Sequence, residues 1–157
     1  TYSVVSAVTN VSLGRVRDLL AETRERTGNA HFPSTAAVSA SEPLVKYFVK
    51  VTNTGTVDSD DVVLGFLVPP NAGKDGVPLQ TLFGFERVHV KAGESVTVWL
   101  YPALTDFAIA DLDGHRAPLP GEYTVRFGVK EAAAHGMGFA EVALTATATD
   151  PSLVEAA

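Results

Sequence analysis

Acidic and histidine side chains, which could bind a cation or transfer protons, gather in two short stretches of this chain. One stretch holds Asp58, Asp60 and Asp61, and the other holds Asp111, Asp113 and His115. Oxygen ligands at alternate positions can hold a hard cation such as Ca²⁺, but neither stretch has the terminal glutamate and full ligand spacing of a calcium loop. Aspartate is also common in turns, because its carboxylate accepts hydrogen bonds from the nearby backbone. We therefore predict two turns here, with a cation-binding module as the alternative.

No catalytic motif accompanies these side chains. The four histidines are scattered along the chain without the paired spacing of a zinc site, at His31, His89, His115 and His135. The sequence contains neither a G-x-S-x-G nucleophile elbow nor a glycine-rich phosphate loop. The absence of cysteine removes disulfides and thiolate ligands. We expect this chain to supply no catalytic residue, no metal site and no cofactor site.

The composition is that of a folded domain. Apolar residues make up 46% of the chain and charged residues 19%, a balance typical of globular proteins. The formal net charge is -6, from 12 basic and 18 acidic residues, and no basic stripe is present to follow a nucleic-acid backbone. No apolar run approaches the roughly 20 residues of a membrane span. A length of 157 residues predicts one domain, residues 1–157.

The clearest secondary-structure signal lies at Pro78–Tyr101. Apolar residues alternate with a period of two on both sides of a glycine-containing break at Lys91–Glu94, which predicts a strand, a tight turn and a second strand. We interpret the segment as a β-hairpin. Its predicted inward-facing residues are Phe85, Val88, Val96 and Val98. A hairpin is stable only when further sheet packs on its apolar face, so the rest of the chain must supply that sheet.

Similar alternation predicts strands along much of the remaining chain. They cover residues 1–10, 44–52, 62–68, 105–111, 122–129 and 139–149. The strand at 62–68 is apolar on both faces, which is typical of a strand in the middle of a sheet. After the first strand, Ser12 can cap a helix in which Val16, Leu19 and Leu20 share one face.

This order of elements predicts an all-β fold, an immunoglobulin-like β-sandwich of about eight strands. We interpret the helix and the small-residue loop after it as a short insertion following the first strand, at about residues 12–42. The core of the sandwich is expected at about residues 44–129, and an extra strand and tail at about residues 130–157.

Several large apolar side chains leave the predicted sheets on the faces opposite to the core. Alternation within its strand turns Trp99 outward together with Thr97 and Tyr101. Phe48 and Phe66 also fall opposite to the predicted core faces. Exposed apolar patches mark contact surfaces, so we predict that a protein partner covers these residues. A carbohydrate-stacking platform on Trp99 and Tyr101 is the alternative.

Two features concern the cellular context of the chain. Asn10 begins an N-x-S triplet, a candidate N-glycosylation site that has meaning only in a secretory pathway. The chain starts at Thr1 without a methionine or a signal segment. We interpret it as a fragment or a processed chain.

A series of short motifs follows in a fixed order. They are V-x-V-T-N-T-G at 49–55, an acidic turn and strand that end at Pro69–Pro70, P-L-Q-x-L-F-G-F-E-R-V at 78–88, K-A-G-E-S-V-T-V at 91–98, D-F at 106–107, D-x-D-G at 111–114 and P-G-E-Y-T-V-R-F-G at 120–128. In this order they make residues 44–129 resemble the C-terminal fibronectin type III-like domain of family 3 glycoside hydrolases. The wording is closer to the β-xylosidase and arabinosidase branch than to the β-glucosidases.

The resemblance implies a fibronectin type III-like β-sandwich that is a non-catalytic accessory domain. The enzyme would be a retaining, two-carboxylate glycoside hydrolase whose nucleophile and acid/base lie in preceding domains, and neither residue matches a position here. The partners of this chain would be those catalytic domains, on the same or a companion chain, with oligosaccharide bound only indirectly. The enzyme would be secreted, and the loop at 71–77 would frame its substrate entrance. A free-standing carbohydrate-binding or adhesion module is the alternative function.

Overall fold

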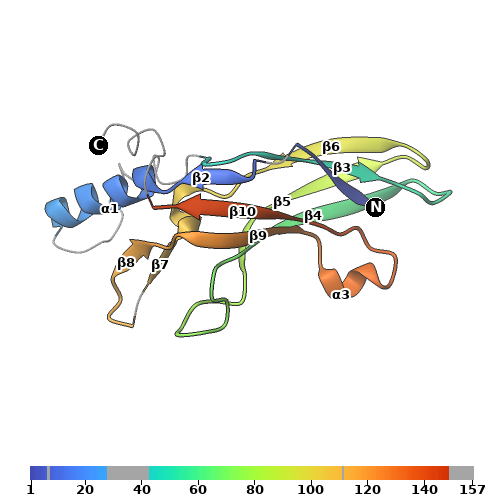
Figure 1. Cartoon of the computed structure of the whole chain (residues 1–157). Helices are drawn as coiled ribbons and strands as arrows, with labels where there is room; N and C mark the ends of the chain where they lie inside the picture. Colours follow the sequence, from blue (N-terminus) through green and yellow to red (C-terminus); the bar gives the residue numbers. More distant parts are fainter. Residues whose placement is uncertain (7, 28–42, 111, 149–157) are drawn as a thin grey trace.

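The chain folds as a sandwich of two β-sheets. The computed structural model describes residues 1–6, 8–27, 43–110 and 112–148. The three-stranded sheet contains β1 (Tyr2–Ser6), β3 (Tyr47–Thr52) and β6 (Ser95–Leu100), in that spatial order. The five-stranded sheet contains β2 (Asn10–Ser12), β10 (Ala140–Thr147), β9 (Gly121–Phe127), β4 (Ser59–Val68) and β5 (Thr81–Val90), in that order. The prediction of an all-β sandwich is confirmed (Figure 1).

The core lies between the two sheets and follows the predicted alternation. Every second residue of β3 and of β9 is buried, because successive side chains of a strand point to opposite faces. Tyr47 of β3 and Phe127 of β9 meet edge to face across the sandwich, with ring centroids 5.7 Å apart. The apolar strand β4 lies inside its sheet, between β9 and β5, as predicted.

One corner of the sandwich is held by Tyr123, near the start of β9. Its hydroxyl donates a hydrogen bond to the carbonyl oxygen of Leu119, four residues earlier, at 2.6 Å. This arrangement is the tyrosine corner of immunoglobulin-like sandwiches. Burial raises the pKa of the Tyr123 phenol, so the hydroxyl remains a donor.

The predicted hairpin at 78–101 is wrong. β5 pairs with β4 and β6 pairs with β3, so the two strands belong to different sheets. The connecting turn is instead bonded to the turn after β3, since Gly93 donates to the carbonyl of Asn53 at 3.0 Å and Ala92 to the carboxylate of Asp58 at 2.9 Å. Alternation identifies strands, but it does not identify their partners.

Two of the four residues predicted to face inward from this segment are not buried. Val98 is buried and Val88 packs against the core, whereas Phe85 is 65% exposed and Val96 is 37% exposed. Phe85 lies three positions before Val88 in a regular part of β5, so the two side chains must take opposite faces. Val96 has the inward direction but lies on an edge strand, where the sandwich is open.

Two other predicted strands are interrupted. Residues 1–10 do not form one strand, because β1 joins the three-stranded sheet and β2 begins at Asn10 in the five-stranded sheet. The segment at 105–111 opens with the 3-10 helix η1 (Leu104–Phe107), followed by the short strand β7 (Ala108–Ala110). β7 pairs with β8 (Arg116–Pro118) in a separate two-stranded ribbon.

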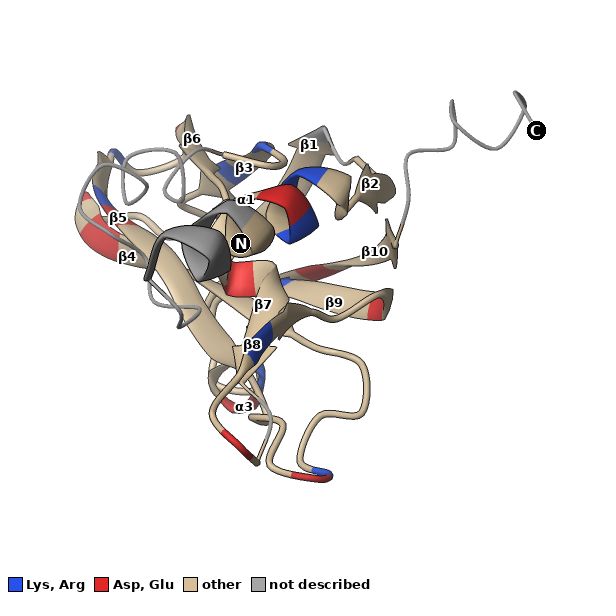
Figure 2. Ribbon diagram, turned by 90° about the vertical axis from the view of Figure 1, so that its left-hand side faces the viewer, with Lys and Arg blue, Asp and Glu red and all other residues tan. Residues whose placement is uncertain are grey.

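Helix α1 (Gly14–Thr27) closes one end of the sandwich (Figure 2). The residues predicted to share its apolar face, Val16, Leu19 and Leu20, are buried in the common core. The helix packs against η1 and β8. Residues 28–42 of the predicted insertion lie outside the described residues. The helix itself is a packed part of the domain.

The strand predicted as an extra one is also inside the structure. β10 follows the short helix α3 (Lys130–Ala133) and lies between β9 and β2. It runs antiparallel to β9 and parallel to β2. In the described part of the chain, no helix is long and apolar enough to cross a membrane.

Candidate interaction surface

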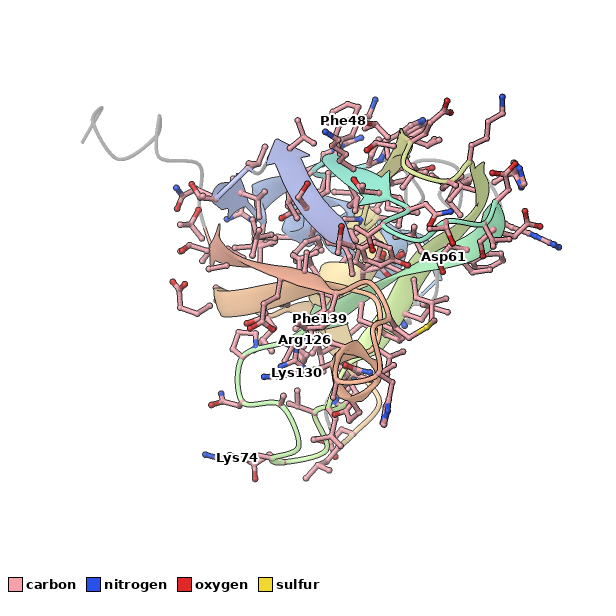
Figure 3. The ribbon with its side chains drawn as sticks, turned by 90° about the vertical axis from the view of Figure 1, so that its right-hand side faces the viewer. Phe48, Asp61, Lys74, Arg126, Lys130 and Phe139 are labelled. Atoms are coloured by element: carbon pink, nitrogen blue, oxygen red, sulfur yellow. The ribbon has the colours of Figure 1, made fainter. Side chains whose placement is uncertain are left out.

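The outer face of the three-stranded sheet carries a pair of exposed aromatic residues. Phe48 of β3 and Trp99 of β6 lie directly opposite each other in the antiparallel ladder. Phe48 is 41% exposed and Trp99 is 52% exposed. Figure 3 shows Phe48 on this face, on the other side of the molecule from Lys74 and Lys130. The pair is a direct consequence of the alternation that buries Val49 and Val98.

Neighbouring side chains hold the indole ring of Trp99 in place. The ring of Tyr101 stacks on it, with centroids 5.4 Å apart and planes inclined by 16°. The Lys46 ammonium lies 5.5 Å from the centroid of the indole ring, within the range of a cation–π interaction. A pre-oriented aromatic group of this kind loses little conformational entropy when a partner covers it.

Four of the five predicted interface residues therefore share one face. Thr97 is exposed and lies opposite Lys50 in the ladder, beside Trp99. Phe66 is apart from the others. It lies on β4 in the five-stranded sheet, opposite Leu82 of β5 and Arg126 of β9, and is half-buried.

Asn10, the candidate glycosylation site, is exposed on the edge strand β2. Its side-chain amide donates to the hydroxyl of Thr9 at 3.1 Å. Exposure is required for modification, and whether Asn10 is glycosylated stays a prediction.

An open seam runs between the edges of β5 and β6. It has a volume of about 680 Å³. Its lining residues are Phe83, Gly84, Phe85, Glu86, Val88, Val96, Thr97, Val98, Trp99, Leu100, Tyr101 and Ala103. The seam is continuous with the aromatic face, because Trp99 and Tyr101 belong to both. The carboxylate of Glu86 lies among predominantly apolar neighbours.

The aspartates after β3 form three separate sets of hydrogen bonds. Asp60 binds the Arg87 guanidinium at 2.7 Å and the His89 ring at 2.6 Å. The hydrogen bonds from His89 and then from Arg87 lower the pKa of the Asp60 carboxyl. Asp61 accepts the hydroxyl of Tyr2 at 2.7 Å, and Asp58 accepts the backbone amide of Ala92. Each of the three carboxylates thus accepts at least one hydrogen bond from the protein itself.

The second acidic stretch lies in the loop between β7 and β8. Asp113 and His115 are exposed there, and Asp111 lies outside the described residues. His31 also lies outside them, whereas His135 is exposed after α3. Among the residues that the structure describes, no group of three histidine, aspartate or glutamate side chains is placed to hold a metal ion.

Two acidic residues at informative positions were not singled out by the sequence reasoning. Glu86 lies two residues before Val88, on the side of β5 that faces the seam, so alternation alone could have found it. Asp106 is in η1, where its carboxylate accepts the backbone amide of Ala103 at 2.6 Å. Burial raises the pKa of Asp106, against the lowering effects of that hydrogen bond and of Arg116.

Comparison with known proteins agrees with this fold. Residues 61–130 match the fibronectin type III-like domain family. A probable exo-1,4-beta-xylosidase of Aspergillus clavatus is 42% identical over 84 residues, which cover 53% of this chain and 11% of that protein. A probable exo-1,4-beta-xylosidase of Aspergillus terreus is 34% identical over 100 residues, covering 62% of this chain and 13% of that protein.

Two solved structures show the same fold in larger proteins. A beta-glucosidase from Listeria innocua superposes with a TM-score of 0.64 and 17% identity, over 95% of this chain and 16% of that one. A beta-glucosidase from Erythrobacter marinus gives a TM-score of 0.53 and 26% identity, over 65% of this chain and 13% of that one. The chain thus spans between a tenth and a sixth of the length of these proteins. Fold, ordered motifs and the family match agree that this chain carries a fibronectin type III-like domain.

Proposed function

We propose that this chain is a non-catalytic accessory domain of a secreted, exo-acting family 3 glycoside hydrolase that removes terminal β-linked sugars from xylo-oligosaccharides. Its role is to pack against the catalytic domains and stabilise them. The observation that carries the proposal is the 42% identity with a probable exo-1,4-beta-xylosidase in a segment that makes up 11% of that protein. The relatives' remaining length leaves room for the domains that carry the reaction.

The aromatic face supports the packing role. Phe48, Trp99 and Tyr101 form an apolar patch that contributes nothing to the core of this domain. Covering a large aromatic side chain stabilises a protein by about 1.5–3 kcal/mol, and central aromatic residues commonly dominate interfaces. The loop at 71–77 belongs to the same proposal, framing the substrate entrance. It is closed by backbone hydrogen bonds between Gly73 and Val77 and between Lys74 and Asn71, both at 2.9 Å.

The test uses the natural polypeptide that carries this chain, with Phe48 and Trp99 both changed to serine. Release of xylose from xylobiose and the thermal midpoint of unfolding are measured. We expect the midpoint to fall by several degrees, since roughly 2 kcal/mol or more of interface contact is lost. Activity at low temperature should persist, because neither side chain takes part in the reaction.

The matched control is Leu112→Ser, which removes a side chain that is 89% exposed on the β7–β8 ribbon, away from this face. It should leave the midpoint unchanged. The double variant should lower the midpoint of the 157-residue chain by less than that of the long polypeptide, because only the contacts of Phe48 and Trp99 within this domain are lost there. An unaltered midpoint of the double variant in the long polypeptide would show that catalytic domains do not cover this face.

The stacked Trp99–Tyr101 pair favours a second candidate, a free-standing carbohydrate-binding module. Calorimetric titration of the 157-residue chain with xylo-oligosaccharides tests it. Binding that disappears in Trp99→Ala would support this function. Absence of heat at millimolar oligosaccharide, with the aromatic face covered in the long polypeptide, would eliminate it.

A further inference from the structure

Among the described strands, β6 lies at a sheet edge and lacks the features that normally prevent edge pairing. Its six residues contain neither a charge nor a proline, and its register with β3 is regular throughout. In Figure 2 it carries no charged residue. Natural edge strands are usually protected by charges, prolines or bulges. By contrast, the register of the opposite edge, β1, is irregular between Val4 and Ser6.

Two hydrogen bonds at one end of the β3–β6 ladder show which way the backbone groups of β6 point. The amide of Asn53 donates to the carbonyl of Glu94 at 3.0 Å, toward β6. The amide of Thr52 donates to the carbonyl of Thr1 at 2.9 Å, toward β1. Bonded and non-bonded residue pairs alternate along an antiparallel ladder. The partner of Thr52 in β6, Ser95, is therefore in a non-bonded pair.

The same alternation assigns the remaining amides of β6. Val96, Val98 and Leu100 exchange hydrogen bonds with β3. The amides and carbonyls of Thr97 and Trp99 point away from β3, toward the open edge. A further strand at this edge could therefore bond to β6 without disturbing any existing pair.

The seam beside this edge would accept the side chains of such a strand. Phe83 and Val88, which pack against the core, and the exposed Val96 line it without being fully buried. A strand paired with β6 would direct every second side chain into this space. Glu86 adds one carboxylate to the apolar lining.

We propose that an extended segment of the same polypeptide, outside residues 1–157, pairs with β6 and fills the seam with alternate apolar side chains, one basic residue of the segment facing Glu86. The inference rests on the proposed function and adds the mode of contact. The relatives supply the required length of chain, since the matched segment is 11% of one such protein. A second copy fits less well, because it would bring another Glu86 and another net charge of -6.

Residue-resolved amide hydrogen exchange in the natural long polypeptide tests the inference. We expect the amides of Thr97 and Trp99 to be protected like those of Val96 and Val98, which serve as internal controls. In the 157-residue chain the same two amides should exchange at least about 100-fold faster. The contrast between alternate residues of one strand distinguishes strand pairing from general coverage.

Two substitutions at one position sharpen the test. Thr97→Pro removes the outward amide, and an edge strand tolerates proline where the amide faces solvent. Thr97→Val keeps that amide and the strand propensity. In the long polypeptide the proline variant should lose protection at Trp99, and the valine variant should retain it. If the proline variant does not fold, the exchange contrast in the unmodified polypeptide decides the question.

Two results would overturn the inference. Fast exchange of Thr97 and Trp99 in the long polypeptide would exclude strand pairing. In that case, a lower thermal midpoint of the Phe48 and Trp99 serine variant would still support the accessory role. An unchanged midpoint would contradict both the accessory role and the strand pairing. Protection that appears in the 157-residue chain with rising concentration would identify the occupant as a second copy.

Discussion

Asp106 shows how a single carboxyl group can couple stability to pH. Its side chain satisfies the amide of Ala103, a donor at the start of η1 that has no partner within that helix. Burial is nevertheless the largest influence on Asp106 and raises its pKa. Asp106 thus stabilises the start of η1 through a hydrogen bond, while its burial disfavours the ionised carboxylate.

The change Asp106→Asn should separate these two effects. Because the pKa of Asp106 is raised in the folded state, its carboxyl stabilises the fold fully at a pH below the ordinary pKa of 3.8. This contribution is lost as the pH rises through the raised pKa of the folded state. The asparagine variant does not titrate and keeps an acceptor. We therefore expect it to gain stability relative to the parent from about pH 3 to about pH 7, measured by urea unfolding.

Asp106→Ala is the comparison, because it removes both the charge and the acceptor. It should gain on the parent with the same pH dependence but be less stable than the asparagine variant by about 1 kcal/mol throughout. Parallel pH profiles for the parent and Asp106→Asn would contradict burial as the cause.

At the scale of elements, helix α1 was predicted to belong to an insertion, but in the structure its apolar face is part of the core. Its apolar stripe packs over η1 and β8 at one end of the sandwich. Short helices gain most of their stability from such tertiary packing rather than from propensity. The helix and the sandwich should therefore unfold together.

The substitution Leu19→Ala measures this coupling. Leu19 is 3% exposed, and truncation of a buried leucine costs about 2–5 kcal/mol. We expect a loss of that size in one cooperative urea transition. Arg15→Ala, on the exposed side of the same helix, should change stability by less than about 0.5 kcal/mol. A separate early transition for helix signal would show that α1 is only loosely attached.

At the scale of the whole molecule, the two sides of the sandwich where edge strands of the two sheets meet differ from each other. On the β1 side, the ring of Tyr2 lies against Gly138, where any side chain would collide with it. The Tyr2 hydroxyl donates to Asp61 of the other sheet at 2.7 Å. Burial and then Asp61 raise the pKa of Tyr2, so it remains a donor. On the β5–β6 side, the described residues leave the seam open.

Tyr2→Phe tests the closed side. The ring is kept and only the hydrogen bond to a carboxylate is lost, which we expect to cost about 1.5–3 kcal/mol in urea unfolding. Tyr101→Phe is the matched control on the outer face, with an expected change below about 0.5 kcal/mol. Equal effects of the two variants would mean that Tyr2 does not bridge the sheets.

Much of this protein was determined by local sequence. The strands β3, β4 and β9, the apolar stripe of α1 and the outward direction of Trp99 all follow from the period of side chains along a strand or helix. The ordered motifs at 49–128 were sufficient to identify the domain type. These features depend on neighbours in sequence, which a single chain displays directly.

Only the tertiary structure decided which strands pair and which faces remain open. β5 and β6 alternate like a hairpin, yet the amides of their connecting turn bond to Asn53 and Asp58 of another turn, and the strands enter different sheets. The exposure of Val96 and the burial of α1 follow from that arrangement. Pairing depends on hydrogen bonds between residues distant in sequence, and local periodicity carries no information about them.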